Sequence, residues 1–371
     1  MLRFAIPQSH WRIPIRRYIP ELDGLRAFAI FGVLMVHCNF GFRTPWLETV
    51  RSWGWVGVDL FFVISGYLIT SILLSSRERP NYFRNFYARR GLRIWPLYYV
   101  LLIYIFAVTP HLGKWARQDV DLHQYPWPYY ALYIQNLVLK RLGSFALVIT
   151  WSLCVEEQFY LFWPMVVRWC SRRKLEIGLV AVIVIEPLLR YYMKYTGHGM
   201  YGFITWCRLD ALAAGALIVL RPRWTKHGWV ALPVAVWLLW SGEWVLVYSA
   251  LAIGFASVIT YVVSTPNRFL AWTPVSFVGK ISYGIYIMHP LVFAIFWKTP
   301  LNWGTEHWPH DNLIRMVGQI LLPIPVAALS WHLFEKPILG LKKYFDSDSP
   351  RAGFPQPAPE LRPAIAAEAG D

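Results

Sequence analysis

Long apolar stretches recur along almost the whole chain, and this pattern restricts its fold more than any other feature. Ten segments are apolar and long enough to approach the thickness of a lipid bilayer. They cover residues 24–40, 55–75, 94–110, 149–168, 176–193, 204–220, 227–242, 244–264, 276–297 and 313–334. A soluble domain with one membrane anchor would not repeat the pattern in this way. We therefore predict an all-α polytopic membrane protein with about ten transmembrane helices.

The composition agrees with a membrane protein. Of the 371 residues, 56% are hydrophobic and 15% are charged, whereas roughly 25% of the residues in a typical soluble domain are charged. The chain also contains 21 tryptophans and 21 tyrosines. These side chains are typical of the two interfaces between a membrane and water.

Basic residues alternate between loops, and this alternation predicts the orientation of the chain. Every second loop is rich in arginine and lysine and is expected on the cytoplasmic side. The basic loops carry Arg77, Arg79, Arg84, Arg89, Arg90 and Arg93, then Arg168, Arg172, Arg173 and Lys174, then Arg221, Arg223 and Lys226, and finally Lys336, Lys342 and Lys343. Both termini are therefore predicted to be cytoplasmic, in a multi-pass protein of a bacterial inner membrane. Because this topology accounts for the net charge of +15, we expect no nucleic-acid partner.

The two ends of the chain differ from its apolar centre. Residues 1–20 combine several arginines with no sustained apolar run, which predicts a cytoplasmic basic arm and no cleavable signal peptide. Residues 21–340 would form the transmembrane domain. Residues 341–371 end in a stretch rich in proline, alanine and acidic residues, which predicts a disordered cytoplasmic tail. The four cysteines show no CxxC spacing, so we expect structural thiols, no disulfide framework and no metal site.

The first apolar segment contains a histidine at membrane depth, where ionisable groups are costly and mark candidate functional sites. Arg26 and His37 are eleven residues apart, which in a helix places them within about 20° of one face and about 16 Å apart along the axis. With the N-terminus inside, Arg26 would lie near the cytoplasmic surface and His37 in the outer half of the membrane. A snorkelling arginine and a structural histidine would show the same spacing, so the pair alone does not establish a site.

Other apolar segments bring more ionisable groups to the predicted level of His37. They are Glu156 or Glu157, Arg208, Asp210 and His289. Arg208 and Asp210 can be interpreted as a structural pair that neutralise each other. Together with His37, however, five such groups at one depth are more than packing requires. We therefore predict a polar site in the outer half of the membrane.

A second polar group is predicted near the cytoplasmic side and is mostly basic. It comprises Asp23, Arg26, Arg90, Arg93 and Lys280. Such a group suits a molecule that carries phosphate, although the positive-inside pattern also accounts for most of it. A histidine beside a carboxylate can act as a general base towards a hydroxyl. A proton-coupled transporter would use the same groups, so at this point both functions stay open.

Local motifs then resemble, in order, the signature of the acyltransferase-3 family of membrane acyltransferases. The sequence Glu-Leu-Asp-Gly-Leu-Arg at 21–26 is followed by ten residues and His37, and Phe-Phe-Val-Ile-Ser-Gly-Tyr-Leu follows at 61–68. The later motifs are Arg90-Gly-Leu-Arg93 before Trp95-Pro96, Trp151-Ser-Leu to Tyr160, Arg208-Leu-Asp210, Gly279 to His289-Pro290, and Phe334-Glu-Lys-Pro337. The likeness covers about residues 18–340, and the ordered set is far more specific than any single motif.

The resemblance implies an O-acyltransferase. Such an enzyme takes an acyl group, usually acetyl from cytoplasmic acetyl-CoA, and passes it to a hydroxyl of an extracytoplasmic or lipid-linked carbohydrate. The coenzyme A thioester would be bound by the basic inner residues Arg26, Arg90, Arg93 and Lys280. His37 would be the general base, and Glu156 or Glu157 would orient it or act on the acceptor side. Arg208 and Asp210 would be positioning groups, and an acyl-histidine intermediate stays open.

The acceptor side is the least defined part of this hypothesis. The residues expected to contact the acceptor are Asp23, Trp151, Ser152, Tyr160 and His289. The aromatic loop 111–148 suits sugar stacking, but it suits anchoring at the membrane interface equally well. Some members of the family carry an esterase-like domain after the last helix, where about 35 residues follow here. The acceptor is thus expected to reach the membrane site itself, or a separate partner to complete a second transfer.

One alternative function is an exporter of acylated or succinylated glycans, for which the polar site would be a translocation path. It predicts glycan outside the cell with unchanged ester content. The sequence shows no internal repeat of the kind on which many transporters are built. The acceptor sugar, the length of the acyl chain and the formation of a homo-oligomer stay open.

Overall fold

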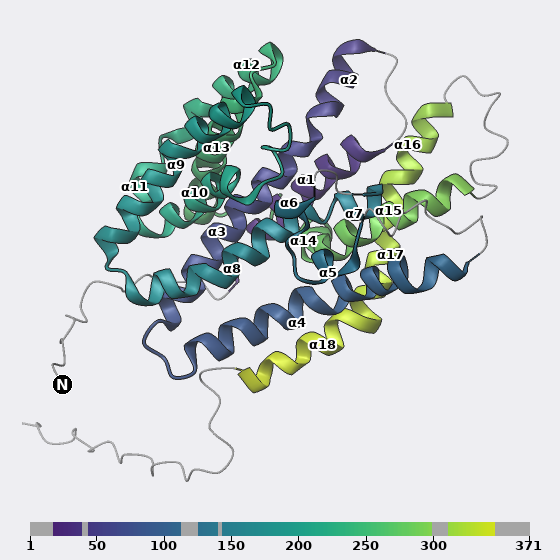
Figure 1. Cartoon of the computed structure of the whole chain (residues 1–371), viewed down its shortest axis with the longest axis horizontal. Helices are drawn as coiled ribbons and strands as arrows, with labels where there is room; N and C mark the ends of the chain where they lie inside the picture. Colours follow the sequence, from purple (N-terminus) through teal and green to yellow (C-terminus); the bar gives the residue numbers. More distant parts are fainter. Residues whose placement is uncertain (1–17, 39–43, 113–124, 140–142, 299–310, 346–371) are drawn as a thin grey trace, which may run out of the picture.

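The structure is a computed structural model that describes residues 18–38, 44–112, 125–139, 143–298 and 311–345 (Figure 1). Within these residues the chain is helical and contains no β-strand, so the all-α prediction is confirmed. Each of the ten apolar segments coincides with helix. The proposed basic arm and disordered tail lie outside the described residues, except for residues 18–20 and 341–345.

The helices form one long series. The longer ones are α1 (Pro20–His37), α3 (Val56–Ser76), α4 (Tyr82–Ile103), α8 (Trp151–Trp169), α9 (Arg172–Tyr195), α10 (Leu209–Leu220), α12 (Ala231–Ser241), α13 (Trp244–Ser264), α15 (Ser282–Lys298) and α16 (Asp311–Leu321). The shorter ones are α2 (Pro45–Ser52), α5 (Trp127–Ala131), α6 (Gln135–Val138), α7 (Phe145–Val148), α11 (Pro222–Thr225), α14 (Thr273–Lys280), α17 (Pro323–Ser330) and α18 (Lys336–Gly340). Turns of 3-10 and π helix extend several of them.

Five helical stretches in the described part of the chain are long and apolar enough to cross a membrane. They are Pro45–Ser76, Tyr82–His111, Phe145–Trp169, Trp244–Ser264 and Met316–Phe345, and α14 with α15, bent by 68°, would be a sixth. Helix α1 falls outside this set because Glu21, Asp23 and Arg26 lie among its eighteen residues, and α10 is short at twelve. The chain is thus a multi-pass membrane protein, while ten crossings and cytoplasmic termini stay predictions.

Two groups of helices pack on either side of α1 and α3 (Figure 1). Helices α9, α10, α12 and α13, drawn in teal and green, pack against one another and, through α10 and α13, against α3. On the other side α14 and α15 contact α1, and α15 also contacts α4 and α17. Side chains from α1, α3, α4, α8 and α15 therefore face a common interior.

Helices α3 and α10 touch backbone to backbone. A Cβ atom added at Gly215 would lie 2.8 Å from the backbone nitrogen of Tyr67, and one added at Gly66 would lie 2.8 Å from the carbonyl carbon of Leu212. Small residues allow this approach between membrane helices. The contact fixes α10 against α3, and the start of α10 carries Arg208.

We expect Gly215→Val to destabilise the fold by at least about 1–3 kcal/mol, because the backbone of α3 cannot move aside as a side chain would. Thermal unfolding in detergent and the yield of monodisperse protein measure this loss. Gly178→Val in α9 is the matched control, since no atom lies within 4 Å of a Cβ added there. Equal melting temperatures for the two variants would show that the close contact between α3 and α10 is not needed.

Candidate active site

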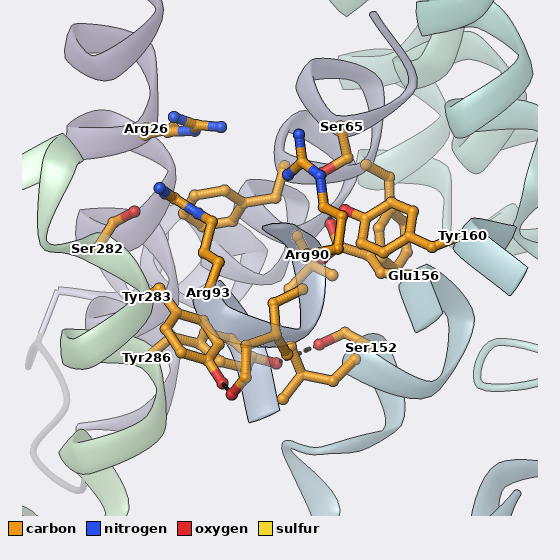
Figure 2. A pocket seen from close by; sticks show the side chains of 15 residues that line it. Arg26, Ser65, Arg90, Arg93, Ser152, Glu156, Tyr160, Ser282, Tyr283 and Tyr286 are labelled. Carbon is orange, nitrogen blue, oxygen red and sulfur yellow. Dashed lines mark hydrogen bonds between the residues drawn. The ribbon is translucent and has the colours of Figure 1, made fainter. Parts of the chain in front are cut away.

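A cavity between α1, α3, α4, α8 and α15 has a basic end (Figure 2). It encloses about 670 Å³ of space free of protein atoms. Arg26 of α1 lines it together with Arg90 and Arg93 of α4, and Figure 2 shows their three guanidinium groups at the same end. Arg90 and Arg93 are three residues apart, so the helix presents both on neighbouring positions of one face. We call this space the inner cavity.

The arginines of the inner cavity differ in their partners. Arg26 forms an ion pair with Asp23, at 2.8 Å from Nη1 to Oδ1. Within the described residues, neither Arg90 nor Arg93 forms an ion pair, and Arg90 lies over the ring of Tyr160 at 5.7 Å. Two guanidinium groups thus keep hydrogen-bond donors for an anionic molecule, and their planar geometry suits phosphate.

The two carboxylates of α8 that were predicted as site residues, Glu156 and Glu157, line different spaces. Glu156 lines the inner cavity and accepts a 2.6 Å hydrogen bond from the hydroxyl of Ser65. Glu157 instead accepts a hydrogen bond from Trp95 and lines a different groove. Neither of them lines the cavity that contains His37. A role of Glu156 or Glu157 in orienting His37 or on the acceptor side stays a prediction.

The end of the inner cavity opposite the arginines is closed by a pair of hydroxyl groups (Figure 2). The hydroxyl of Tyr286 donates to the carbonyl of Ile149 at 2.7 Å, and so it accepts from Ser152, whose oxygen is 2.7 Å away. Tyr286 and Val58 line this cavity and also the next one. We call the hydrogen-bonded pair of Ser152 and Tyr286, together with Val58, the partition.

Beyond the partition lies a second cavity, of about 780 Å³, which contains His37. We call it the outer cavity. Its walls are mainly aromatic and aliphatic, and the aromatic lining residues include Trp55, Trp151, Phe203 and Tyr248. Of the groups predicted to share one depth, His37 and Arg208 both line it.

His37 has a histidine partner. Its Nδ1 lies 3.1 Å from Nε2 of His289, and Nδ1 of His289 lies 2.7 Å from the carbonyl oxygen of Tyr286. Since a carbonyl only accepts, His289 donates through Nδ1, and the Nε2 of neutral His289 accepts from Nδ1 of His37. Nε2 of neutral His37 then carries a lone pair. His289 therefore fixes the tautomer of the His37 ring. A contact between His289 and the acceptor stays a prediction.

Arg208 is buried with only part of its hydrogen-bonding capacity used. Its side chain is 1% exposed, and Nη2 donates to Asp59 at 2.8 Å. Nε and Nη1 have no hydrogen-bond partner in the described part of the chain. The guanidinium also lies 3.9 Å from the ring centre of Tyr248. The guanidinium group of Arg208 therefore lines the cavity that contains His37 and has two nitrogens, Nε and Nη1, whose hydrogen-bond donors are unused in the described residues.

The interpretation that Arg208 and Asp210 neutralise each other is wrong. Asp210 forms its ion pair with Arg190, at 2.9 Å, and accepts from Ser249 at 2.7 Å. The two residues are only two positions apart at the start of a helix, and such positions point to different sides. Asp210 is therefore part of the buried network that holds the start of α10, and it does not line the outer cavity.

The remaining predicted residues are divided between the two cavities and the surface. Trp151 lines the outer cavity, while Ser152 and Tyr160 line the inner one. Lys280 is exposed, lies over the ring of Trp331 at 5.2 Å and does not line the inner cavity. Within the described residues, no three His, Cys, Asp or Glu side chains gather where they could hold a metal ion.

Sequence reasoning missed Asp59, Ser65 and Tyr286. Asp59 was detectable, because it is an ionisable residue inside the second apolar segment, and such residues are candidates by default. Ser65 and Tyr286 carry no charge, and polar side chains of this kind are common in membrane helices. Only their contacts in the fold identify them.

Comparisons with known proteins agree on one family. The profile of a family described as an acyltransferase domain matches residues 19–332. The peptidoglycan O-acetyltransferase OatA of Listeria monocytogenes is 27% identical over 89% of this chain and 57% of its own length. The O-acetyltransferase OatA of Staphylococcus aureus is 28% identical over 87% of this chain and 57% of its own length. The chain thus spans just over half the length of these relatives, and no solved structure matches it.

Proposed function

This chain belongs to the acyltransferase-3 family, and from that premise we propose that it is a membrane O-acyltransferase. It takes an acyl group, acetyl in the first instance, from acetyl-CoA on the cytoplasmic side of a bacterial inner membrane. It passes the group to a hydroxyl of an extracytoplasmic or lipid-linked carbohydrate. The observation that supports this most strongly is the position of His37, which lines one cavity, while a cavity lined by arginines shares Tyr286 and Val58 with it.

On the donor side, the inner cavity holds the coenzyme A thioester. Arg90 and Arg93 bind its phosphates, because both keep free guanidinium donors within a cavity that contains one carboxylate, Glu156. Arg26 contributes a third positive charge, partly offset by Asp23. The acyl group then passes between Tyr286 and Val58 when the hydrogen bond to Ser152 opens.

In the outer cavity, His37 acts as the general base. Nε2 removes the proton of the acceptor hydroxyl while that oxygen attacks the thioester carbonyl carbon. The carbonyl becomes an oxyanion, which the unused donors of Arg208 stabilise. The carbon–sulfur bond then breaks, the ester forms, and the imidazolium of His37 returns its proton to the departing thiolate. The same lone pair would serve an acyl-histidine variant.

The acceptor is a carbohydrate held by the aromatic wall of the outer cavity. Rings such as those of Trp55 and Trp151 offer flat apolar faces with a polar edge, which suits the face of a sugar. The relatives compared above are named for peptidoglycan or for O-acetylation. Peptidoglycan is therefore the first acceptor to test, ahead of other surface glycans.

Proteoliposomes that contain the full chain test this proposal. Deuterium-labelled acetyl-CoA is supplied on one side and peptidoglycan fragments or other surface glycans on the other, and the glycans are analysed by mass spectrometry. The expected result is a labelled O-acetyl ester that depends on the protein. Glycan that changes sides without gaining label would favour the exporter and reject the acyltransferase.

His289 provides a further prediction, because it accepts the Nδ1 proton of His37. We expect His289→Ala to lower kcat by up to about 10⁴-fold, since the base loses the partner that fixes its tautomer. His289→Gln should recover a large part of this loss, because an amide oxygen can accept the same proton. The pH profile of kcat is measured alongside. If the two variants were equally inactive with unchanged pH profiles, a tautomer-fixing role would be ruled out.

A further inference from the structure

A long groove runs along the outside of α9. None of the residues that line it lines either of the two cavities. The groove encloses about 1490 Å³ and is formed by one stripe of α9 together with residues that follow α10. Three arginines, Arg172, Arg173 and Arg221, lie at one end with Trp224. Apart from Glu176, the rest of the wall is apolar and consists of Ile177, Val180, Ala181, Val184 and Ile185.

The basic end of the groove is held in place by a buried carboxylate. Glu176 accepts from Arg172 at 2.9 Å and from Arg221 at 2.8 Å, and its own side chain is 8% exposed. Arg221 lies over the ring of Trp224 at 5.2 Å. The three arginines and one glutamate leave an excess of two positive charges. Two guanidinium groups are thus positioned before any ligand arrives, and Arg173 adds a third charge that forms no ion pair in the described part of the chain.

The apolar part of the groove extends along α9 from the basic end. Ile177 and Ile185 are eight residues apart, which corresponds to about 12 Å along the helix. Both side chains are exposed, at 60% and 57%, as expected for a surface that faces lipid. The groove therefore combines a fixed cationic end with an apolar wall along one face of α9.

We propose that this groove binds an anionic glycerophospholipid, with the phosphate at Arg173 and Arg221 and one acyl chain along Val180 and Val184. The charge of the basic end selects an anionic headgroup over a zwitterionic one. The basic end belongs to the loops that the positive-inside pattern assigns to the cytoplasm, so the lipid would stand upright in the inner leaflet. This site does not depend on the acyltransferase chemistry.

The test uses purified full-length protein that is stripped of lipid and exposed to phosphatidylglycerol or phosphatidylcholine with identical chains. Native mass spectrometry counts retained lipids, and thermal unfolding measures stabilisation. We expect phosphatidylglycerol to be retained and to raise the melting temperature more than phosphatidylcholine does. The double variant Arg173→Gln/Arg221→Gln should bind phosphatidylglycerol about thirtyfold more weakly, given the usual contribution of each arginine near an anionic lipid surface.

The matched control is Lys174→Gln/Arg223→Gln, which removes the same charge from neighbouring positions outside the groove lining. It should keep the affinity of the unmodified protein. Ala181→Trp fills the groove without changing charge and should lose the lipid as well. The proposal is overturned if the control loses as much affinity as the double variant, or if Ala181→Trp retains phosphatidylglycerol. Equal retention of phosphatidylcholine, equal stabilisation by inorganic phosphate, or a protein dimer that covers the groove would also overturn it.

Discussion

His37→Gln is expected to lower the rate of acetyl transfer by about 10²–10⁴-fold, the usual contribution of a general base. Glutamine fills most of the space of imidazole but cannot take a proton at neutral pH. The Michaelis constant for acetyl-CoA should stay close to that of the unmodified protein, because His37 does not line the inner cavity. Initial rates in proteoliposomes at several acetyl-CoA concentrations separate the two effects.

The control for this experiment is His227→Gln, since His227 is exposed and lines neither cavity. It should leave both kinetic constants unchanged. Thermal unfolding of each variant shows whether the protein is folded. A folded His37→Gln protein that transfers acetyl at a normal rate would remove His37 from the chemistry. A variant that mainly raises the Michaelis constant would place His37 in binding.

Arg208→Gln should lower kcat by about 10²–10³-fold if the unused donors of Arg208 stabilise the oxyanion. The same change leaves Asp59 as an unpaired buried carboxylate, which by itself destabilises a protein by about 3–5 kcal/mol. A single variant therefore cannot separate a catalytic loss from a loss of structure. Rates and melting temperatures must be measured together.

The double variant Asp59→Asn/Arg208→Gln separates the two roles. Neutral amides replace both charges, so the melting temperature should recover most of what Arg208→Gln loses. Transfer should stay low, because the donors to the oxyanion are still absent. If activity returned together with stability, the pair of Arg208 and Asp59 would be structural only.

The sequence identified ionisable residues within apolar segments, but it did not show the direction in which each side chain points. His37 and Arg26 are identifiable because ionisable residues in a membrane helix are rare, and helical geometry gives their separation along the axis. Glu156 and Glu157 have nearly the same height, yet adjacent residues on a helix point about 100° apart. One of them reaches the inner cavity and the other reaches Trp95. Which carboxylate faces inward depends on how α8 is rotated against its neighbours.

Partners across helices were equally hard to assign. Arg208 pairs with Asp59, which is 149 residues away in the chain, and His37 pairs with His289, which is 252 residues away. A single sequence contains no signal for such distances, and the only partner of Arg208 that it suggested was the neighbouring Asp210, as one of two interpretations. The helical segments, by contrast, follow from local hydrophobicity and were predicted well.

The partition has a consequence for the energy supply of the cell. A continuous polar tunnel between the two sides of an energised membrane would conduct protons and dissipate the proton-motive force. Here the hydroxyl groups of Ser152 and Tyr286 satisfy each other and the carbonyl of Ile149, beside the apolar side chain of Val58. In this closed arrangement, hydroxyl groups that are already hydrogen-bonded and an apolar side chain lie between the arginine-lined cavity and the cavity of His37. If the chain has the proposed function, this partition lets it stay in the membrane between turnovers without acting as an ion leak.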